Sequence, residues 1–174
     1  DVRLHLNESP YPPPKHVVKY AVDLLQYGNL YINSKLFNKF RELLAGYVGV
    51  DVENVFPTLG GDGALRTIFY ELTYPNDSVV ILNPTYSMVN VFTSLRGLKK
   101  LTVDLYECSD WWCVDFNELL SSVRKSYLVV VDDPNNPTGS PILKGSIKLV
   151  SELAEVVGGF LVIDETYYSS QDIL

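Results

Sequence analysis

The sequence predicts an α/β fold, a three-layer sandwich with a mostly parallel sheet, and three observations lead to that prediction. Short apolar runs rich in Val, such as residues 128–131 and 160–163, are typical of strands buried on both faces. These runs alternate with segments whose apolar residues recur at helical spacing. No internal repeat or flexible linker interrupts the alternation.

The first half of the chain opens with an arm and then favours helices. Four prolines in residues 6–14 remove hydrogen-bond donors and favour an extended backbone. Helical spacing then predicts a helix over residues 15–27, stopped by Gly28, and another from Ser34, a plausible N-cap, to the break at Gly49. Glycines in residues 60–63 precede a third predicted helix over residues 64–72.

The second half alternates strands and helices. Apolar runs or alternation predict strands over residues 78–82, 99–105, 128–131 and 160–163. Helical spacing predicts helices over residues 88–95, 116–123 and 143–156, the last stopped by Gly158 and Gly159. Residues 107–115 show neither pattern, so we expect a loop there.

Size and composition limit the classes of function. The 174 residues suffice for one domain with a sizeable core, and we expect part of one: an arm with the first helix (1–30), then the start of a larger domain (31–174). A net charge of -7 without a basic run argues against nucleic-acid binding. No apolar run approaches the roughly 20 residues of a membrane span, and no signal peptide is recognisable, so we expect a cytoplasmic protein. Cys108 and Cys113 predict two thiols, with neither a disulfide framework nor a metal site.

Polar residues follow the predicted strands at their carboxyl ends, where parallel sheets bind ligands. Asn136 lies in a turn that two prolines make rigid, and Asp164 directly follows a buried strand. Asp164 also fits a helix N-cap, a loop carboxylate or a Walker B acid, although the last requires a G-x-x-x-x-G-K-[ST] loop that the sequence lacks. The glycines before residue 64 fit an anion-binding helix terminus, or merely a turn with Asp62 as N-cap.

Residues 136–139, followed one helix and one strand later by residues 164–167, resemble the fold type I aminotransferases that use pyridoxal 5'-phosphate. The resemblance is closest to the histidinol-phosphate aminotransferase group, whose N-P-N-N-P-T-G, P-T-Y-S-M and D-E-x-Y motifs are similar to residues 134–139, 84–88 and 164–167. It extends from about residue 6 over nearly the whole chain, and it implies that residues 31–174 are the amino-terminal portion of the large domain that binds the cofactor.

The resemblance implies a set of cofactor-binding residues. Asp164 would pair with the pyridine nitrogen and keep it protonated, which makes the ring an electron sink. Asn136 and Tyr167 would hydrogen-bond the phenolic oxygen, and Tyr86 would stack on the ring. The remaining contacts, to the phosphate, would come from Gly61, Asp62 and Gly63, and from Tyr31 of the other subunit of a homodimer with a shared active site.

The resemblance also implies the reaction, an amino-group transfer between a histidinol phosphate-like donor and a 2-oxo acid. We expect the Schiff-base lysine beyond Leu174, so no catalytic residue lies within the chain and the 174 residues alone should be inactive. Asp133 and Gly63 depart from the family motifs, which bears on the substrate more than on the cofactor. Two alternatives remain: a lyase of the same fold, similar to threonine-phosphate decarboxylase, and a non-catalytic binding module.

Overall fold

The computed structural model of the chain describes residues 6–168. The chain divides into two compact units, Asp1–Phe56 and Pro57–Leu174. None of the helices in the described range combines the length and the apolar character that a membrane crossing requires.

The first unit is helical and has almost no core of its own. It contains α1 (Lys15–Leu25), α2 (Ser34–Val48) and a 3-10 turn, η1 (Val52–Asn54). The side chain of Asn33 accepts hydrogen bonds from the first amides of α2, so the N-cap lies one residue before the predicted Ser34. Ala45 is the only buried residue of the two α-helices. The apolar side chains of this unit are therefore left largely exposed.

The second unit contains a five-stranded sheet of order β3-β2-β1-β4-β5. Strands β1, β2, β4 and β5 run parallel, and β3 pairs antiparallel with β2 at the edge. The strand bounds are Ser78–Asn83 (β1), Lys99–Cys108 (β2), Trp111–Val114 (β3), Leu128–Asp132 (β4) and Phe160–Asp164 (β5). The helices are Gly60–Leu72 (α3), Ser87–Arg96 (α4), Phe116–Val123 (α5) and Ile147–Val156 (α6).

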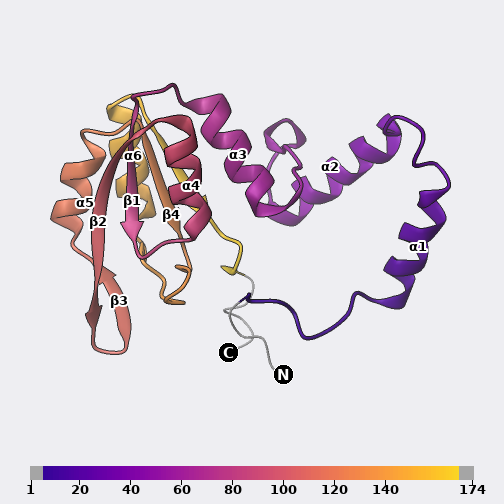
Figure 1. Cartoon of the computed structure of the whole chain (residues 1–174), viewed down its shortest axis with the longest axis horizontal. Coiled ribbons are helices and arrows are strands. Elements are labelled where there is room, and N and C mark those ends of the chain that lie inside the picture. Colours follow the sequence, from indigo (N-terminus) through magenta and orange to yellow (C-terminus); the bar gives the residue numbers. More distant parts are fainter. Residues whose placement is uncertain (1–5, 169–174) are drawn as a thin grey trace. The chain divides into compact units, whose positions relative to one another are not determined.

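Two apolar cores lie on opposite faces of this sheet and confirm the predicted three layers (Figure 1). Alternate residues of β1 point to opposite faces: Val80 and Leu82 join the core with α5 and α6, whereas Val79 and Ile81 join the core with α3 and α4. Because β1 and β4 are buried on both faces, their apolar runs are continuous rather than alternating. The predicted mostly parallel α/β sheet is thus confirmed.

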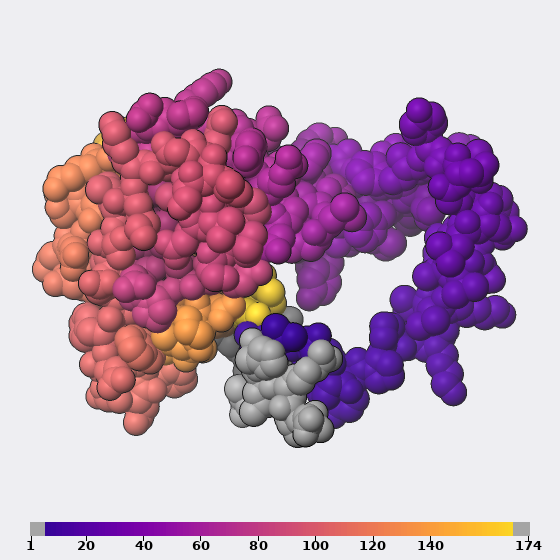
Figure 2. Space-filling model, in the orientation of Figure 1, coloured from indigo at the N-terminus to yellow at the C-terminus, as the bar shows by residue number. Residues whose placement is uncertain are grey.

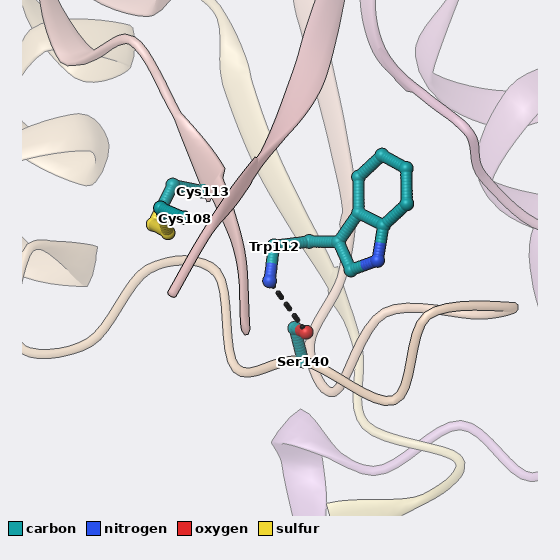
Figure 3. The surroundings of a disulfide bond; sticks show 4 residues. All are labelled: Cys108, Trp112, Cys113 and Ser140. Carbon is teal, nitrogen blue, oxygen red and sulfur yellow. Dashed lines mark hydrogen bonds between the residues drawn. A yellow bond between two sulfur atoms is a disulfide. The ribbon is translucent and has the colours of Figure 1, made fainter. Parts of the chain in front are cut away.

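The segment between β2 and α5 corrects two expectations. Residues 107–115 are not a loop: β2 extends to Cys108, and β3 returns antiparallel, with Cys108 opposite Trp111. The tight return brings the Cα atoms of Cys108 and Cys113 to 6.0 Å, within the range of a disulfide, and the structure joins them by one (Figure 3). The expectation of two thiols was therefore wrong, because cysteine spacing alone does not reveal a hairpin.

Candidate functional site

The carboxyl ends of the parallel strands bring three turns to one edge of the sheet. Asp132 and Asp164 are directly paired at the ends of β4 and β5. The backbone N–H of Asp133, which begins the turn after β4, donates to the carbonyl of Asp164 at 3.0 Å. Figure 2 shows the orange segment after β4 beside the yellow segment after β5. Side chains that are far apart in sequence can therefore act on one ligand.

Tyr86 connects the turn after β1 with the start of α3. It lies immediately before α4, is half-buried, and donates its hydroxyl to Asp62 Oδ1 at 3.1 Å. Partial burial of the ring raises the pKa of this hydroxyl most, followed by the hydrogen bond to Asp62 and the electrostatic effects of Asp62, Tyr167 and Asp164. These four predicted site residues therefore share one electrostatic environment.

Asp164 ends β5 half-buried and is held by the turn that follows. Its Oδ1 accepts hydrogen bonds from the backbone N–H of Thr166 at 3.0 Å and from the Thr166 hydroxyl at 2.5 Å. Within residues 6–168, both hydrogen bonds accepted by this carboxylate end on Oδ1. No hydrogen bond from this part of the chain ends on Oδ2, and a carboxylate oxygen of this kind can accept from a further donor, such as a protonated ring nitrogen.

The turn after β4 presents Asn136 through a network of local hydrogen bonds. Asn135 Oδ1 accepts from the Thr138 hydroxyl at 2.8 Å, and the Asn135 N–H donates to the carbonyl of Ser140 at 2.9 Å. The far end of the turn is anchored on the β2–β3 hairpin, where the Trp112 N–H donates to Ser140 Oγ at 2.9 Å (Figure 3). Asn136 itself is half-buried.

Asp133 holds the same turn from its other side. Its two carboxylate oxygens accept hydrogen bonds from the backbone N–H groups of Ile142 and Leu143, at 2.9 and 3.2 Å. A carboxylate in this position satisfies two amides of the loop. The departure from the motif at position 133 therefore has a structural use within the loop.

The glycine-rich turn begins α3 earlier than its sequence pattern suggests. The helix starts at Gly60, whose φ of +71° is the left-handed conformation that glycine adopts without strain. The residue before it, Leu59, has no side chain that caps the first amides. A Cβ on Gly61 would come within 3.7 Å of Thr166 Oγ1, so the glycine turn lies close to the residue that binds Asp164. The start of α3 thus offers backbone donors at the same edge.

The remaining predicted residues differ in what the structure says of them. At Gly63, a Cβ would make only ordinary contact with Thr58, at 3.4 Å, so sterics do not require glycine there. Tyr31 belongs to the first unit, where its side chain is fully exposed. Its contact with a neighbouring subunit stays a prediction. Within residues 6–168, no group of three or more His, Cys, Asp or Glu side chains could hold a metal ion.

Sequence reasoning missed the residue that ties the turns together, Asp132. It is 3% exposed, and its carboxylate accepts hydrogen bonds from the Thr85 hydroxyl (2.9 Å), the Tyr86 N–H (3.2 Å) and the Asn136 N–H (2.8 Å). Burial raises the pKa of Asp132, against the lowering effect of these hydrogen bonds. The sequence carried one signal that could have identified Asp132: it is a charged residue at the end of an otherwise apolar strand.

Comparisons with known proteins agree with this arrangement. A family model described as aminotransferase class I and II matches residues 1–170. A protein of Sulfurisphaera tokodaii named histidinol-phosphate aminotransferase is 49% identical over 167 residues, 96% of this chain and 47% of its own length. One of Archaeoglobus fulgidus, named histidinol-phosphate aminotransferase 1, is 30% identical over 174 residues, 99% of this chain and 51% of its own length.

A solved structure shows the same fold. The histidinol-phosphate aminotransferase of Sinorhizobium meliloti, in complex with pyridoxal-5'-phosphate, is similar with a TM-score of 0.76 and 26% sequence identity. The match covers 95% of this chain and 44% of that one. The chain therefore spans about half the length of the curated relatives and of the solved structure that it matches.

Proposed function

The chain belongs to the class I and II aminotransferases, and on that premise we propose that it contributes the cofactor-binding edge of a pyridoxal phosphate-dependent aminotransferase. The proposed reaction moves an amino group between a histidinol phosphate-like donor and a 2-oxo acid in the cytoplasm. The names of its relatives support this donor. The observation that carries the proposal is that Asp62, Asp164 and Tyr167 all act on the hydroxyl of Tyr86, to which Asp62 is hydrogen-bonded.

The residues at this edge fit the cofactor's chemical groups. Bound pyridoxal phosphate supplies an aromatic ring whose protonated nitrogen draws electrons from the substrate Cα. Asp164 offers a half-buried carboxylate with Oδ2 available, and a negative charge there favours a protonated nitrogen. Tyr86 offers a ring face for stacking, and the Asn136 and Tyr167 side chains offer polar groups for the phenolic oxygen.

The start of α3 fits the phosphate. An uncapped helix N-terminus presents N–H donors and the positive end of the helix dipole to an anion. Gly61 adds no side chain where a phosphate would approach, whereas Asp62 is engaged by the Tyr86 hydroxyl. The Asp62 side chain would therefore orient Tyr86, since a carboxylate and a phosphate repel each other, and the phosphate contact predicted for this residue would come from its backbone N–H in the first turn of α3.

We further propose that the protein is a homodimer with a shared active site. The helices of the first unit leave apolar side chains such as Val17, Leu25 and Phe40 exposed, and surfaces of this kind are usually covered in an assembly. Tyr31, fully exposed, is placed by this proposal at the phosphate of the neighbouring subunit. Subunit mixing tests it: Tyr31→Phe on one subunit and Asp164→Asn on the other should leave one intact site per dimer.

The reaction is tested with the product of the complete reading frame, purified with pyridoxal phosphate. Histidinol phosphate and 2-oxoglutarate should yield glutamate, and Asp164→Asn should abolish most of that yield. Glu165→Gln is the matched control, because Glu165 is the exposed neighbouring carboxylate and its side chain is not assigned to the site. Threonine phosphate, which carries the carboxylate that histidinol phosphate lacks, serves as a second substrate: carbon dioxide release from it without glutamate formation would identify a lyase instead. Cofactor binding without turnover of either substrate would identify a binding module.

A further inference from the structure

Asp132 is the one acidic side chain among the described residues that is buried at the edge of the sheet. Its Oδ2 accepts hydrogen bonds from the backbone N–H groups of Tyr86 and Asn136. Its Oδ1 accepts a hydrogen bond from the Thr85 hydroxyl. The first turn follows β1 and the second follows β4, so one carboxylate joins segments about fifty residues apart in sequence. Two of the donors belong to Tyr86 and Asn136, which the proposed function uses, and the third belongs to Thr85, which is adjacent to Tyr86.

A second hydrogen bond runs between the same two turns. Asn135 donates its side-chain N–H to the carbonyl of Pro84 at 3.0 Å, and Asn135 is itself 1% exposed. The turns are thus joined on two sides, by an amide donor and by a carboxylate acceptor. Two separate hydrogen-bonded connections fix the relative orientation of the turns, whereas a single connection would leave them free to rotate.

We propose that Asp132 is a positioning residue that sets the distance between Tyr86 and Asn136, and so the width of the cofactor site. The positioning follows from the hydrogen bonds alone, whereas its consequence for the cofactor rests on the proposed function. Asp132 contacts neither substrate nor cofactor in this scheme, since all three of its partners are protein groups. The role of the side chain is that of an acceptor, and its charge is not what the turns recognise.

The arrangement of the donors makes this distinction testable. Both backbone N–H groups end on Oδ2, so an asparagine can place its carbonyl oxygen there and keep both. The asparagine NH₂ would then replace Oδ1 and donate to the Thr85 hydroxyl, which can reverse its role because its hydrogen rotates. Burial, which raises the pKa of Asp132, also favours an uncharged side chain. Asp132→Asn should thus preserve the geometry, and Asp132→Ala should lose it.

The experiment measures residue-resolved amide hydrogen exchange in the ligand-free product of the complete reading frame. In Asp132→Ala we expect exchange at the Tyr86 and Asn136 amides to rise about tenfold or more, because both lose their acceptor. Asp132→Asn should keep both within about threefold of wild type. Asp133→Ala is the matched control, and it should raise exchange at Ile142 and Leu143 instead.

The consequence for the cofactor is measured separately, by titration with pyridoxal phosphate and by circular dichroism of the bound ring. Asp132→Ala should weaken binding about tenfold and reduce the dichroic band, while Asp132→Asn should keep both. If the alanine variant does not fold, Asp132→Ser serves in its place, because its short hydroxyl does not reach both amides.

Each outcome decides one of the two ideas. Unchanged exchange at Tyr86 and Asn136 in the alanine or serine variant overturns the positioning role. Equal loss in Asp132→Asn overturns the claim that an uncharged acceptor suffices, because the charge would then be essential. If amide exchange rises in Asp132→Ala but the wild-type protein does not bind pyridoxal phosphate, the positioning role is supported and the proposed function is rejected.

Discussion

Asp132 and Asp164 occupy paired positions at the ends of neighbouring parallel strands, and their carboxylates have contrasting surroundings. Asp132 is buried and accepts three hydrogen bonds from two separate turns. Asp164 is half-buried, and among residues 6–168 the hydrogen bonds that its carboxylate accepts come from Thr166, two residues away. Both oxygens of the Asp132 carboxylate accept hydrogen bonds that hold the fold together, whereas Oδ2 of Asp164 accepts none from residues 6–168, and the proposed function assigns that oxygen to the cofactor.

The contrast shows that position at a strand end does not by itself identify a ligand contact. Ligands in parallel sheets bind beyond the carboxyl ends of the strands, and both residues satisfy that rule. What separates them is how many protein donors already occupy each carboxylate. An acid whose oxygens are all engaged holds the site together, and an acid with an available oxygen can act on what the site binds.

The largest expected effect is a difference in activity between variants of Asp164 and Asp132. Asp164→Asn should lower kcat/KM for glutamate formation by about 10²–10³, because an amide no longer stabilises a protonated ring nitrogen. Asp132→Asn should lower it far less, since an amide can satisfy the same donors. Steady-state kinetics on the two variants decide the matter. A loss at position 132 as large as that at position 164 would remove the distinction between the two acids.

A second effect compares the threonine that serves each acid. Thr85 donates its hydroxyl to buried Asp132, and Thr166 donates its hydroxyl to half-buried Asp164. Thr85→Val should lower the free energy of unfolding by about 1–3 kcal/mol, since a buried acceptor loses its hydroxyl partner. Thr166→Val should change it by no more than about 0.5 kcal/mol, because water can replace an exposed donor. Urea unfolding of both variants measures the difference, and equal losses would contradict the assigned burial.

Local patterns in the sequence mark the strand-end positions of two candidate site residues. Asp164 follows a four-residue apolar run, and Asn136 lies between two prolines, so the amino-acid sequence alone places each at the edge of the sheet. The structure places Asp164, Asp62 and Tyr167 where all three affect the pKa of Tyr86, and the contacts of these residues with a cofactor stay predictions. These patterns are local in sequence, which is why they can be recognised in a single chain.

Features that depend on contacts between distant segments could not be predicted in the same way. The role of Asp132 arises from donors at positions 85, 86 and 136, and nothing near position 132 indicates which amides will approach it. The β2–β3 hairpin was missed for a related reason. Its short return strand, β3, holds two tryptophans and a cysteine without clean alternation of apolar and polar residues. It forms a strand because it pairs with β2, and this pairing is not visible in the local sequence.

The smallest expected effect concerns pH and sharpens the comparison through Asp132 alone. Because its folded-state pKa is raised above the unfolded value of about 3.9, the protonated side chain contributes stability that is fully present below that value. This stability is lost as the pH rises through the folded pKa. Asp132→Asn does not titrate, so the stability of wild type relative to this variant should fall across the same window, by about 1.4 kcal/mol for each unit of pKa difference.

Unfolding free energies of wild type and Asp132→Asn, measured from pH 3 upward, give this difference directly. Thr85→Val provides an internal check, because the Thr85 hydrogen bond lowers the pKa of Asp132 and its removal should extend the window to higher pH. A difference that rises with pH would mean that the three donors outweigh burial and hold Asp132 charged. Hydrogen bonding rather than burial would then set the direction of the pKa shift at Asp132.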